Sequence, residues 1–130
     1  MTEKTAVSTD DAPRNDNPYS QGVLADGLLF VSGFGPVDPE TGEEVEGDVG
    51  TQTHRVVENL AAVVAEAGGS LADVVKTTVY VADMDDYEAV NEAYADHFEE
   101  TPPARVCVEA ARLPDDVRVE IDAIANVEEE

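Results

Sequence analysis

Residue types that build many protein sites are scarce in this chain. It has a single cysteine, Cys107, two histidines and no tryptophan. One cysteine excludes an internal disulfide and any site that needs several thiolates, and two histidines are too few for a transition-metal cluster. We therefore expect no metal site, and composition alone favours Cys107 as a small residue of the core.

Long apolar stretches are missing as well. No run approaches the roughly 18 residues that a membrane-spanning helix requires. The segment from Met1 to Asn17 is polar and contains four acidic residues, so it lacks the apolar centre of a secretion signal. We expect a cytoplasmic protein that does not associate with membranes.

Basic residues are few relative to acidic ones. Seven Lys and Arg face 30 Asp and Glu, which gives a formal net charge of -23. Such a charge repels phosphate backbones, so we expect no nucleic-acid partner. Acidic chains with few aromatic residues are often disordered, but the periodic apolar segments of this chain favour a folded protein. We interpret the acidic surface as an adaptation to concentrated salt and hypothesise a halophilic source.

The chain does contain short periodic segments that predict a single domain over residues 1–130. Alternating or β-branched runs predict strands at 4–7, 20–25, 28–34, 74–81, 104–111 and 117–125. Asp26 and Gly27 separate two of these runs and predict a tight hairpin. The expected fold is α+β, a sheet of five to six strands with two helices on one face.

Two segments have the apolar spacing of a helix. The first covers residues 48–67, and the pair Gly68-Gly69 predicts its end. The second is expected to begin at Asp85, with Glu88 completing a capping box. Its apolar stripe consists of Tyr87, Val90, Tyr94 and Phe98.

The last two predicted strands each have an apolar and a polar set of side chains. In the run 104–111, Val106 and Val108 belong to the apolar set, and Arg105 and Cys107 belong to the other. Glu120 belongs to the polar set of the final strand. We expect the apolar sets to face the helices. The polar sets would then lie on the open face of the sheet, the face that no helix covers.

The open face has two interpretations. A solvated polar face is common in antiparallel sheets. However, Tyr80, Cys107 and Ile124 are unusual residues to expose to water, and packing against other copies of the chain would bury them. The second interpretation places charged groups in clefts between subunits.

Arg105 and Glu120 have the clearest chemical use. A guanidinium forms two parallel hydrogen bonds with a carboxylate, and a nearby carboxylate can act as a general base on water. Together they can bind a small carboxylic acid and deliver water to the adjacent carbon. A cross-strand salt bridge explains the same two residues without any function, and spacing alone does not decide between the two.

The segment 103–109, followed by Val119-Glu120-Ile121, resembles the C-terminal motif of the RidA/YjgF family. Further pieces of the family pattern follow in the family's order along nearly the whole chain, at residues 18–22, 31–33, 39–42, 75–81 and 90–91. The resemblance implies a chorismate-mutase-like fold that assembles as a homotrimer around a central barrel, with sites between subunits. It also implies that the last strand inserts elsewhere in the sheet and does not pair with the run 104–111.

The resemblance further implies an activity. Family members hydrolyse reactive 2-imino acids or their enamine tautomers, such as 2-iminobutanoate and 2-iminopropanoate, to 2-keto acids and ammonia. No cofactor is needed, because an imine carbon is already electrophilic. At the matching positions, Arg105 would bind the substrate carboxylate and Glu120 would position and activate water.

The same resemblance implies further binding residues. Tyr19 would close the cleft, and Ser32 and Gly33 would approach the substrate. Cys107 would line the pocket, and Asn91 would lie near it. Asn91 either orients pocket groups or satisfies a hydrogen bond between helix and sheet.

Two other functions compete with the deaminase. One is a non-catalytic trimer that binds small carboxylates or regulates a partner protein. The other is RNA binding or cleavage, which the net charge disfavours. The presence of both Arg105 and Glu120 favours the enzyme.

Overall fold

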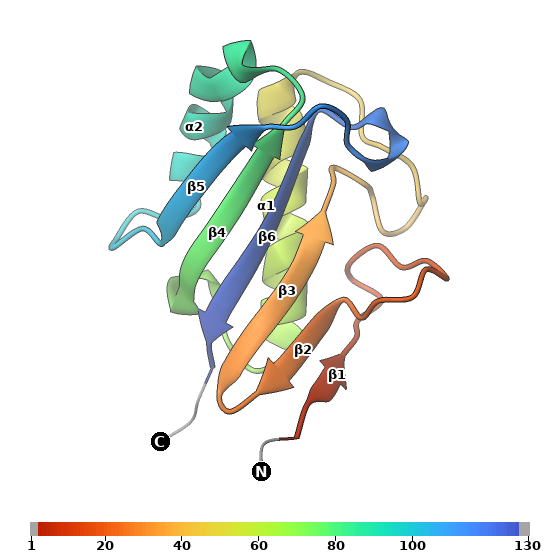
Figure 1. The fold of residues 1–130 in the computed structure, drawn as a ribbon, viewed down its shortest axis with the longest axis vertical. Helices are drawn as coiled ribbons and strands as arrows, with labels where there is room; N and C mark the ends of the chain where they lie inside the picture. The colour runs from red at the N-terminus through yellow and green to blue at the C-terminus, as the bar shows by residue number, and fades with distance from the viewer. Residues whose placement is uncertain (1–2, 128–130) are drawn as a thin grey trace.

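A computed structural model describes residues 3–127; residues 1–2 and 128–130, at the ends of the expected domain, lie outside it. One sheet has the strand order β1-β2-β3-β6-β4-β5, and only the pair β4–β5 is parallel. Figure 1 looks onto the side of the sheet that carries no helix, which we call the open face. The strands are β1 (Thr5–Val7), β2 (Gly22–Ala25), β3 (Leu28–Phe34), β4 (Val74–Val81), β5 (Ala104–Glu109) and β6 (Val119–Asn126).

Two topological predictions are confirmed. Asp26 and Gly27, with φ of 58° and 82°, form the hairpin turn between β2 and β3. The last strand, β6, pairs with β3 on one side and β4 on the other. The α+β fold is therefore as expected, and β5 is an edge strand without direct pairing to β6.

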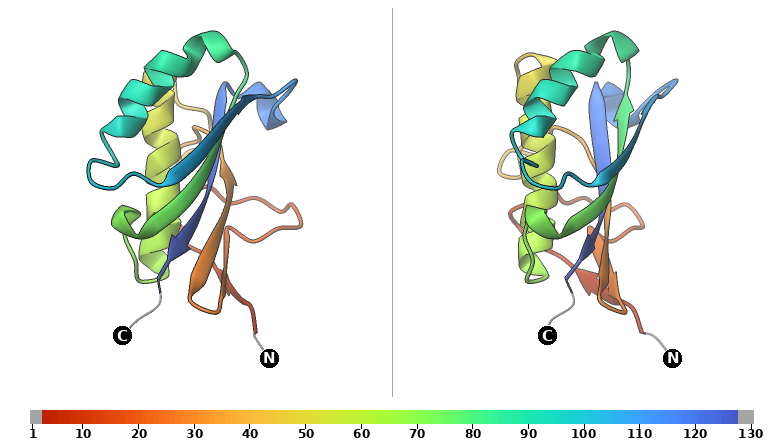
Figure 2. Two further views of the ribbon diagram at one scale, coloured as in Figure 1. Left: turned by 60° about the vertical axis from the view of Figure 1, so that its left-hand side comes forward. Right: turned by 90° about the vertical axis from the view of Figure 1, so that its left-hand side faces the viewer.

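Helices α1 (Val49–Glu66) and α2 (Tyr87–Ala95) cover the same face of the sheet, as the edge-on views in Figure 2 show. The Asp48 carboxylate accepts the Thr51 N–H at 2.8 Å and caps α1. Gly68, at φ 95°, ends it in a left-handed turn. Among residues 3–127, neither helix has both the length and the apolar character of a membrane span.

The start of α2 differs from the expectation. A 3-10 turn (Met84–Asp86) precedes the helix, and the Asp83 carboxylate accepts the Asp85 N–H there. The capping box predicted for Asp85 and Glu88 is therefore wrong. Because the 3-10 turn satisfies the first N–H groups locally, the helix begins two residues later than its sequence pattern suggests.

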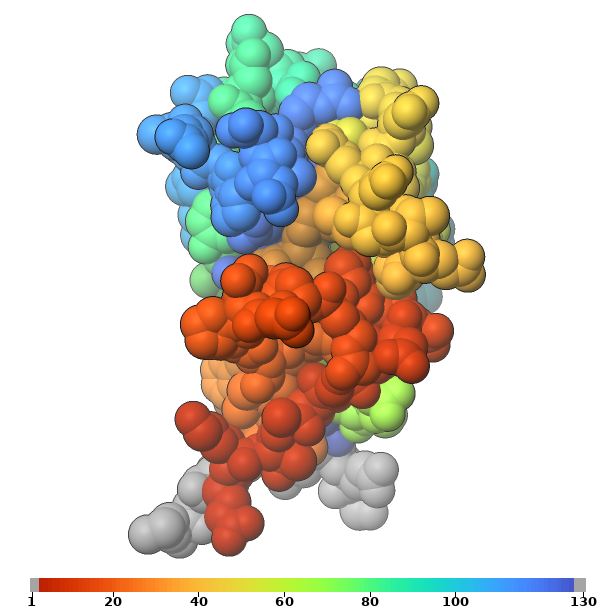
Figure 3. All heavy atoms as spheres, turned by 90° about the vertical axis from the view of Figure 1, so that its right-hand side faces the viewer, coloured from red at the N-terminus to blue at the C-terminus, as the bar shows by residue number. Residues whose placement is uncertain are grey.

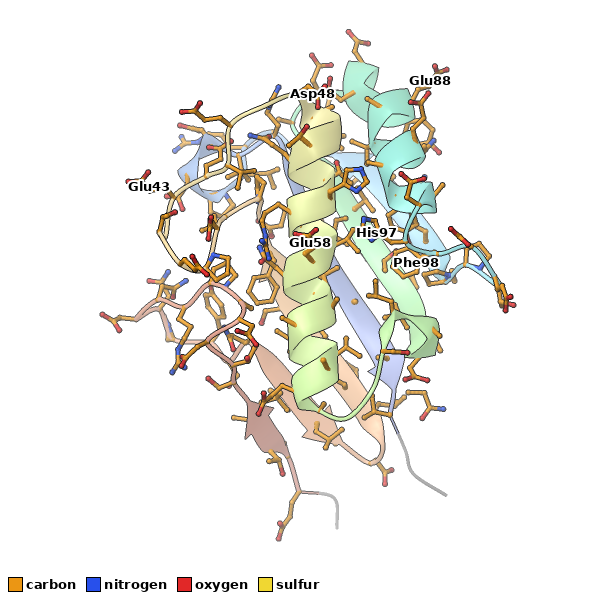
Figure 4. The ribbon with its side chains drawn as sticks, turned by 180° about the vertical axis from the view of Figure 1, so that it is seen from behind. Glu43, Asp48, Glu58, Glu88, His97 and Phe98 are labelled. Atoms are coloured by element: carbon orange, nitrogen blue, oxygen red, sulfur yellow. The ribbon has the colours of Figure 1, made fainter. Side chains whose placement is uncertain are left out.

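The two helices are joined by a pair of histidines that the composition did not single out. His54 Nδ1 on α1 lies 2.8 Å from Nε2 of His97, just beyond α2. Figure 4 shows His97 between the helices, with Glu58 on the outer side of α1. Burial, with His54 as the second cause, lowers the pKa of His97. This contact fixes the helices relative to each other.

The face assignment of β5 was wrong. Arg105 and Cys107 align with Thr77 and Val79, which are buried beneath the helices. Val106 and Val108 therefore point to the open face, where they are 46% and 39% exposed. Alternation predicts two sets of side chains but not which set faces inward, and at this edge the aromatic residues of α2 accommodate the arginine.

The open face of the sheet is partly apolar. Phe30 is 44% exposed and lies opposite Ile124 of β6. Toward the β5 edge, Tyr80 lies between Val108 and Glu120 in the strand register. A single chain thus leaves on this face the kind of side chains that usually lie in an interface.

Candidate functional site

A cavity of about 330 Å³ lies beside β3 and the start of β6, and four of the expected site residues line it: Tyr19, Ser32, Gly33 and Glu120. Three further segments supply the rest of the wall: the loop before β2, the segment after β3 and the turn before β6. Figure 3 shows these three segments bordering one part of the surface. Their lining residues are Pro13, Asn15, Gly35, Val37, Pro114, Asp115 and Val117, and Phe34 at the end of β3 completes the lining.

Gly33 allows the Glu120 carboxylate to lie against the backbone of β3. A Cβ at position 33 would overlap Glu120 Oε2 and would lie only 3.1 Å from Cδ. The register between β3 and β6 also shifts between Val31 and Phe34, and such irregularities re-aim side chains. A glycine within a strand was the sequence signal for this close approach.

The surroundings of Glu120 favour its neutral form. Burial raises the pKa of this carboxyl, and the negative charge of Asp122 raises it further. A carboxyl whose pKa moves toward neutrality can both accept and return a proton near neutral pH. Glu120 therefore has the properties of a general base that can next act as an acid.

The loop before β2 positions the Tyr19 side chain over the cavity. Asn15 Nδ2 donates to the Tyr19 hydroxyl at 2.8 Å, and the Asn15 Oδ1 accepts the Asn17 N–H at 2.8 Å. Tyr19 is 56% exposed in the single chain. Asn15 was not predicted, because nothing in its spacing distinguishes it from other polar loop residues.

Ser32 is fixed by the same loop. Its hydroxyl donates to the Ser20 carbonyl at 2.6 Å, and its N–H donates to the Gln21 carbonyl at 2.9 Å. Because the hydroxyl proton is committed to Ser20, the oxygen of Ser32 offers acceptor lone pairs to a neighbouring group.

Two buried amides that sequence reasoning missed support the cavity wall. The Gln21 side chain accepts the Thr9 N–H at 2.7 Å and donates to the Pro13 carbonyl at 2.8 Å. On α1, Asn59 donates to the carbonyls of Gly35 and Val37 at 3.1 and 3.0 Å. A polar residue inside the apolar stripe of α1 was the available signal for Asn59.

Arg105 lies on the other face of the sheet from this cavity. Its guanidinium carbon is 4.9 Å from the ring centroid of Tyr94 and 5.6 Å from that of Tyr87. The guanidinium also donates to the Tyr87 hydroxyl at 3.3 Å. Cation–π contacts of this kind hold the group in place while leaving its donor fork available.

Cys107 and Asn91 share this second location. Cys107 is half-buried two residues along β5 from Arg105, and burial raises the pKa of its thiol despite the nearby guanidinium. A raised pKa disfavours the thiolate, so the geometry gives Cys107 a lining role. Asn91 lies between Tyr87 and Tyr94 at helical spacing and shares their face of α2.

One chain does not bring Arg105 and Glu120 together. Arg105 on β5 pairs with Thr77 on β4, and Thr77 pairs with Ala123 on β6. Ala123 is three residues along β6 from Glu120. From strand spacing and rise, the Cα atoms of Arg105 and Glu120 are about 14 Å apart, and the side chains point to opposite faces. The cross-strand salt bridge is therefore excluded within a chain, and the expected site is divided into two groups.

Comparisons with known proteins agree with this fold. Residues 9–127 match the family described as Endoribonuclease L-PSP. A RutC family protein of Pyrococcus abyssi is 51% identical over 122 residues, which cover 94% of this chain and 96% of that protein. A 2-iminobutanoate/2-iminopropanoate deaminase of Salmonella typhimurium is 48% identical over 122 residues, covering 92% and 94%. The crystal structure of Escherichia coli TdcF with bound serine matches with a TM-score of 0.89 at 42% identity, covering 96% and 99%.

Proposed function

Since the chain belongs to the RidA/YjgF family, we propose that it hydrolyses reactive 2-imino acids and their enamine tautomers to 2-keto acids and ammonia. The substrates proposed are of the size of 2-iminobutanoate and 2-iminopropanoate. The observation that supports this most directly is Glu120, a half-buried carboxyl with a raised pKa at the wall of a cavity.

The proposed chemistry needs only orientation and proton transfer. The water oxygen bonds to the carbon of the protonated imine, the π electrons of the carbon–nitrogen bond move to nitrogen, and Glu120 accepts a water proton, which gives a neutral carbinolamine. Glu120 then returns that proton to nitrogen, and the carbon–nitrogen bond breaks as the hydroxyl gives its proton to Glu120 and becomes the carbonyl. Ammonia leaves, and Glu120 releases the remaining proton to solvent. Proton transfer of this kind typically contributes about 10²–10⁴-fold in rate.

A homotrimer would complete the site. Phe30, Val106 and Val108 are exposed on the open face, and packing that face around a three-fold axis would bury them. In a cyclic assembly each contact joins different surfaces of two neighbours. We propose that the β5 edge of one subunit meets the cavity of the next, so that Arg105 binds the carboxylate of a substrate placed beside the neighbour's Glu120.

The relatives support a small substrate with a carboxylate. The Salmonella relative is named for 2-imino acid substrates, and TdcF was solved with serine bound. Serine has a carboxylate that a guanidinium can bind in a bidentate manner. The same observation favours a second candidate, a trimer that binds small carboxylates or regulates a partner without turnover.

RNA cleavage is the third function that the family description suggests. A net charge of -23 would repel the phosphate backbone at low salt, and high salt would weaken the contacts that remained. We therefore place the substrate among small molecules. We also propose that the protein is cytoplasmic.

The proposal is tested by following 2-keto acid formation from 2-iminobutanoate released in situ from threonine by a dehydratase, near molar salt. Arg105→Ala is expected to abolish the acceleration while sedimentation still shows a trimer. Arg112→Ala changes an exposed arginine and is the matched control. Retained activity in Arg105→Ala would remove Arg105 from the mechanism, and saturable binding without turnover by the parent protein would favour the binding trimer.

A further inference from the structure

The charged residues that line the Glu120 cavity are all acidic. They are Glu120 and Asp115, and the remaining lining residues are apolar or neutral. Glu120 is committed to the proton transfers proposed above. Asp115 has no such task, so its charge is available to act on whatever part of the substrate lies near the cavity rim.

Asp115 is fixed at the rim by an unusual turn. It lies in the 3-10 turn Pro114–Asp116 with φ 59° and ψ 17°, and Asp116 follows with φ 57°. The Asp116 N–H donates to the Leu113 carbonyl at 3.0 Å and closes the turn. Two consecutive residues with positive φ are uncommon outside glycine, although Asp tolerates this region better than most.

Among the residues that line the two cavities bordered by Asp115, the one cation is already paired with another carboxylate. The adjoining cavity contains Arg14 and Asp10, but these two form an ion pair with each other at 2.7 Å. The guanidinium of a neighbour's Arg105 is assigned above to the substrate carboxylate, so a substrate side chain that lies near the rim meets the negative charge of Asp115.

We infer that Asp115 makes this enzyme select imines by the charge of their side chain, disfavouring acidic side chains and favouring basic ones relative to neutral ones. The inference rests on the proposed imine hydrolysis, because it concerns the same cavity. For one charge at several ångströms in partly solvated surroundings, Coulomb's law gives an effect of about five- to tenfold. The effect should shrink in molar salt, where charges are screened over about 3 Å.

The test compares kcat/KM for imines that amino-acid oxidases release in situ from glutamate, norvaline and arginine, at low and at molar salt. In Asp115→Asn, the ratio of acidic to neutral substrate should rise about five- to tenfold, and the ratio of basic to neutral substrate should fall by a similar factor. Asn also tolerates positive φ, so the turn should persist.

Asp116→Asn is the matched control, because it removes the same charge from the neighbouring residue, which does not line the cavity. Unchanged ratios in Asp115→Asn, or equal changes in both variants, would overturn the selectivity inference. Turnover of the norvaline imine in that case would still support the proposed function. A parent protein that accelerates none of the three reactions would overturn the proposed function, and this inference with it.

Discussion

The features that suit Glu120 to its proposed chemistry should also lower the stability of the folded protein. Its carboxyl is half-buried, lies beside the backbone of Gly33 and faces the negative charge of Asp122. These surroundings make the ionised form unfavourable in the folded protein. Perturbed pKa values of this kind cluster at functional sites.

Glu120→Gln should therefore increase stability at neutral pH. The pKa of Glu120 is raised in the folded state, so its favourable contribution is complete below the unfolded-state value and is lost as pH rises through the folded-state value. The variant should gain free energy of unfolding over the parent as pH rises above 4.5, the ordinary pKa of a glutamate carboxyl. Denaturant unfolding across this range measures the difference.

Glu66→Gln is the control for this prediction, since it neutralises an exposed carboxylate on α1. A stability difference between Glu120→Gln and the parent that stays constant with pH would contradict the account of the cavity. Loss of imine hydrolysis in the same variant would show that activity depends on the unfavourable charge.

At the scale of single elements, α1 shapes the cavity without contributing a lining residue. Asn59 is fully buried on α1 and holds the segment after β3 through the carbonyls of Gly35 and Val37. Both of those residues line the cavity. The position of one cavity wall therefore depends on a side chain on the far side of the sheet.

Asn59→Ala should lower the free energy of unfolding by about 1–3 kcal/mol, because two half-buried carbonyl groups lose their donor. Glu66→Ala, on the exposed side of the same helix, should change it by no more than about 0.5 kcal/mol. Equilibrium unfolding at one fixed protein concentration measures both, since assembly makes stability concentration-dependent. Equal stabilities of the two variants would show that Asn59 does not support the wall.

Most helices and strands were predictable from local sequence patterns. The errors concern side chains whose direction or partners depend on tertiary contacts. The apolar run 28–34, the helical spacing over 48–67 and the β-branched run 74–81 are strong local patterns, and the structure has a strand, a helix and a strand there. The β5 faces were not predictable, because only its register with β4 shows that Arg105 lies under α2. Asn15 and Asn59 were missed because their roles depend on partners distant in space or on a loop conformation.

The whole molecule is dominated by its charge. Thirty acidic residues against seven basic ones produce strong self-repulsion in dilute salt. Three copies around one axis would multiply that repulsion. The folded assembly should therefore depend on screening by the solvent.

We expect the melting temperature to rise as potassium chloride increases from about 0.1 M to above about 1 M, as the Debye length falls from about 10 Å to about 3 Å. Thermal melts followed by circular dichroism measure this, and sedimentation in the same series shows whether the proposed trimer dissociates first. A melting temperature independent of salt would count against a halophilic source.

The most direct test of the central claim is complementation between two inactive variants, Arg105→Ala and Glu120→Gln. They are mixed under conditions that dissociate and reassemble the subunits, and imine hydrolysis is then measured. If each site takes its arginine from one subunit and its glutamate from the next, random mixing restores both residues at about one quarter of the sites. We predict that fraction of the parent activity, and a mixture as inactive as its two components would contradict a site shared between subunits.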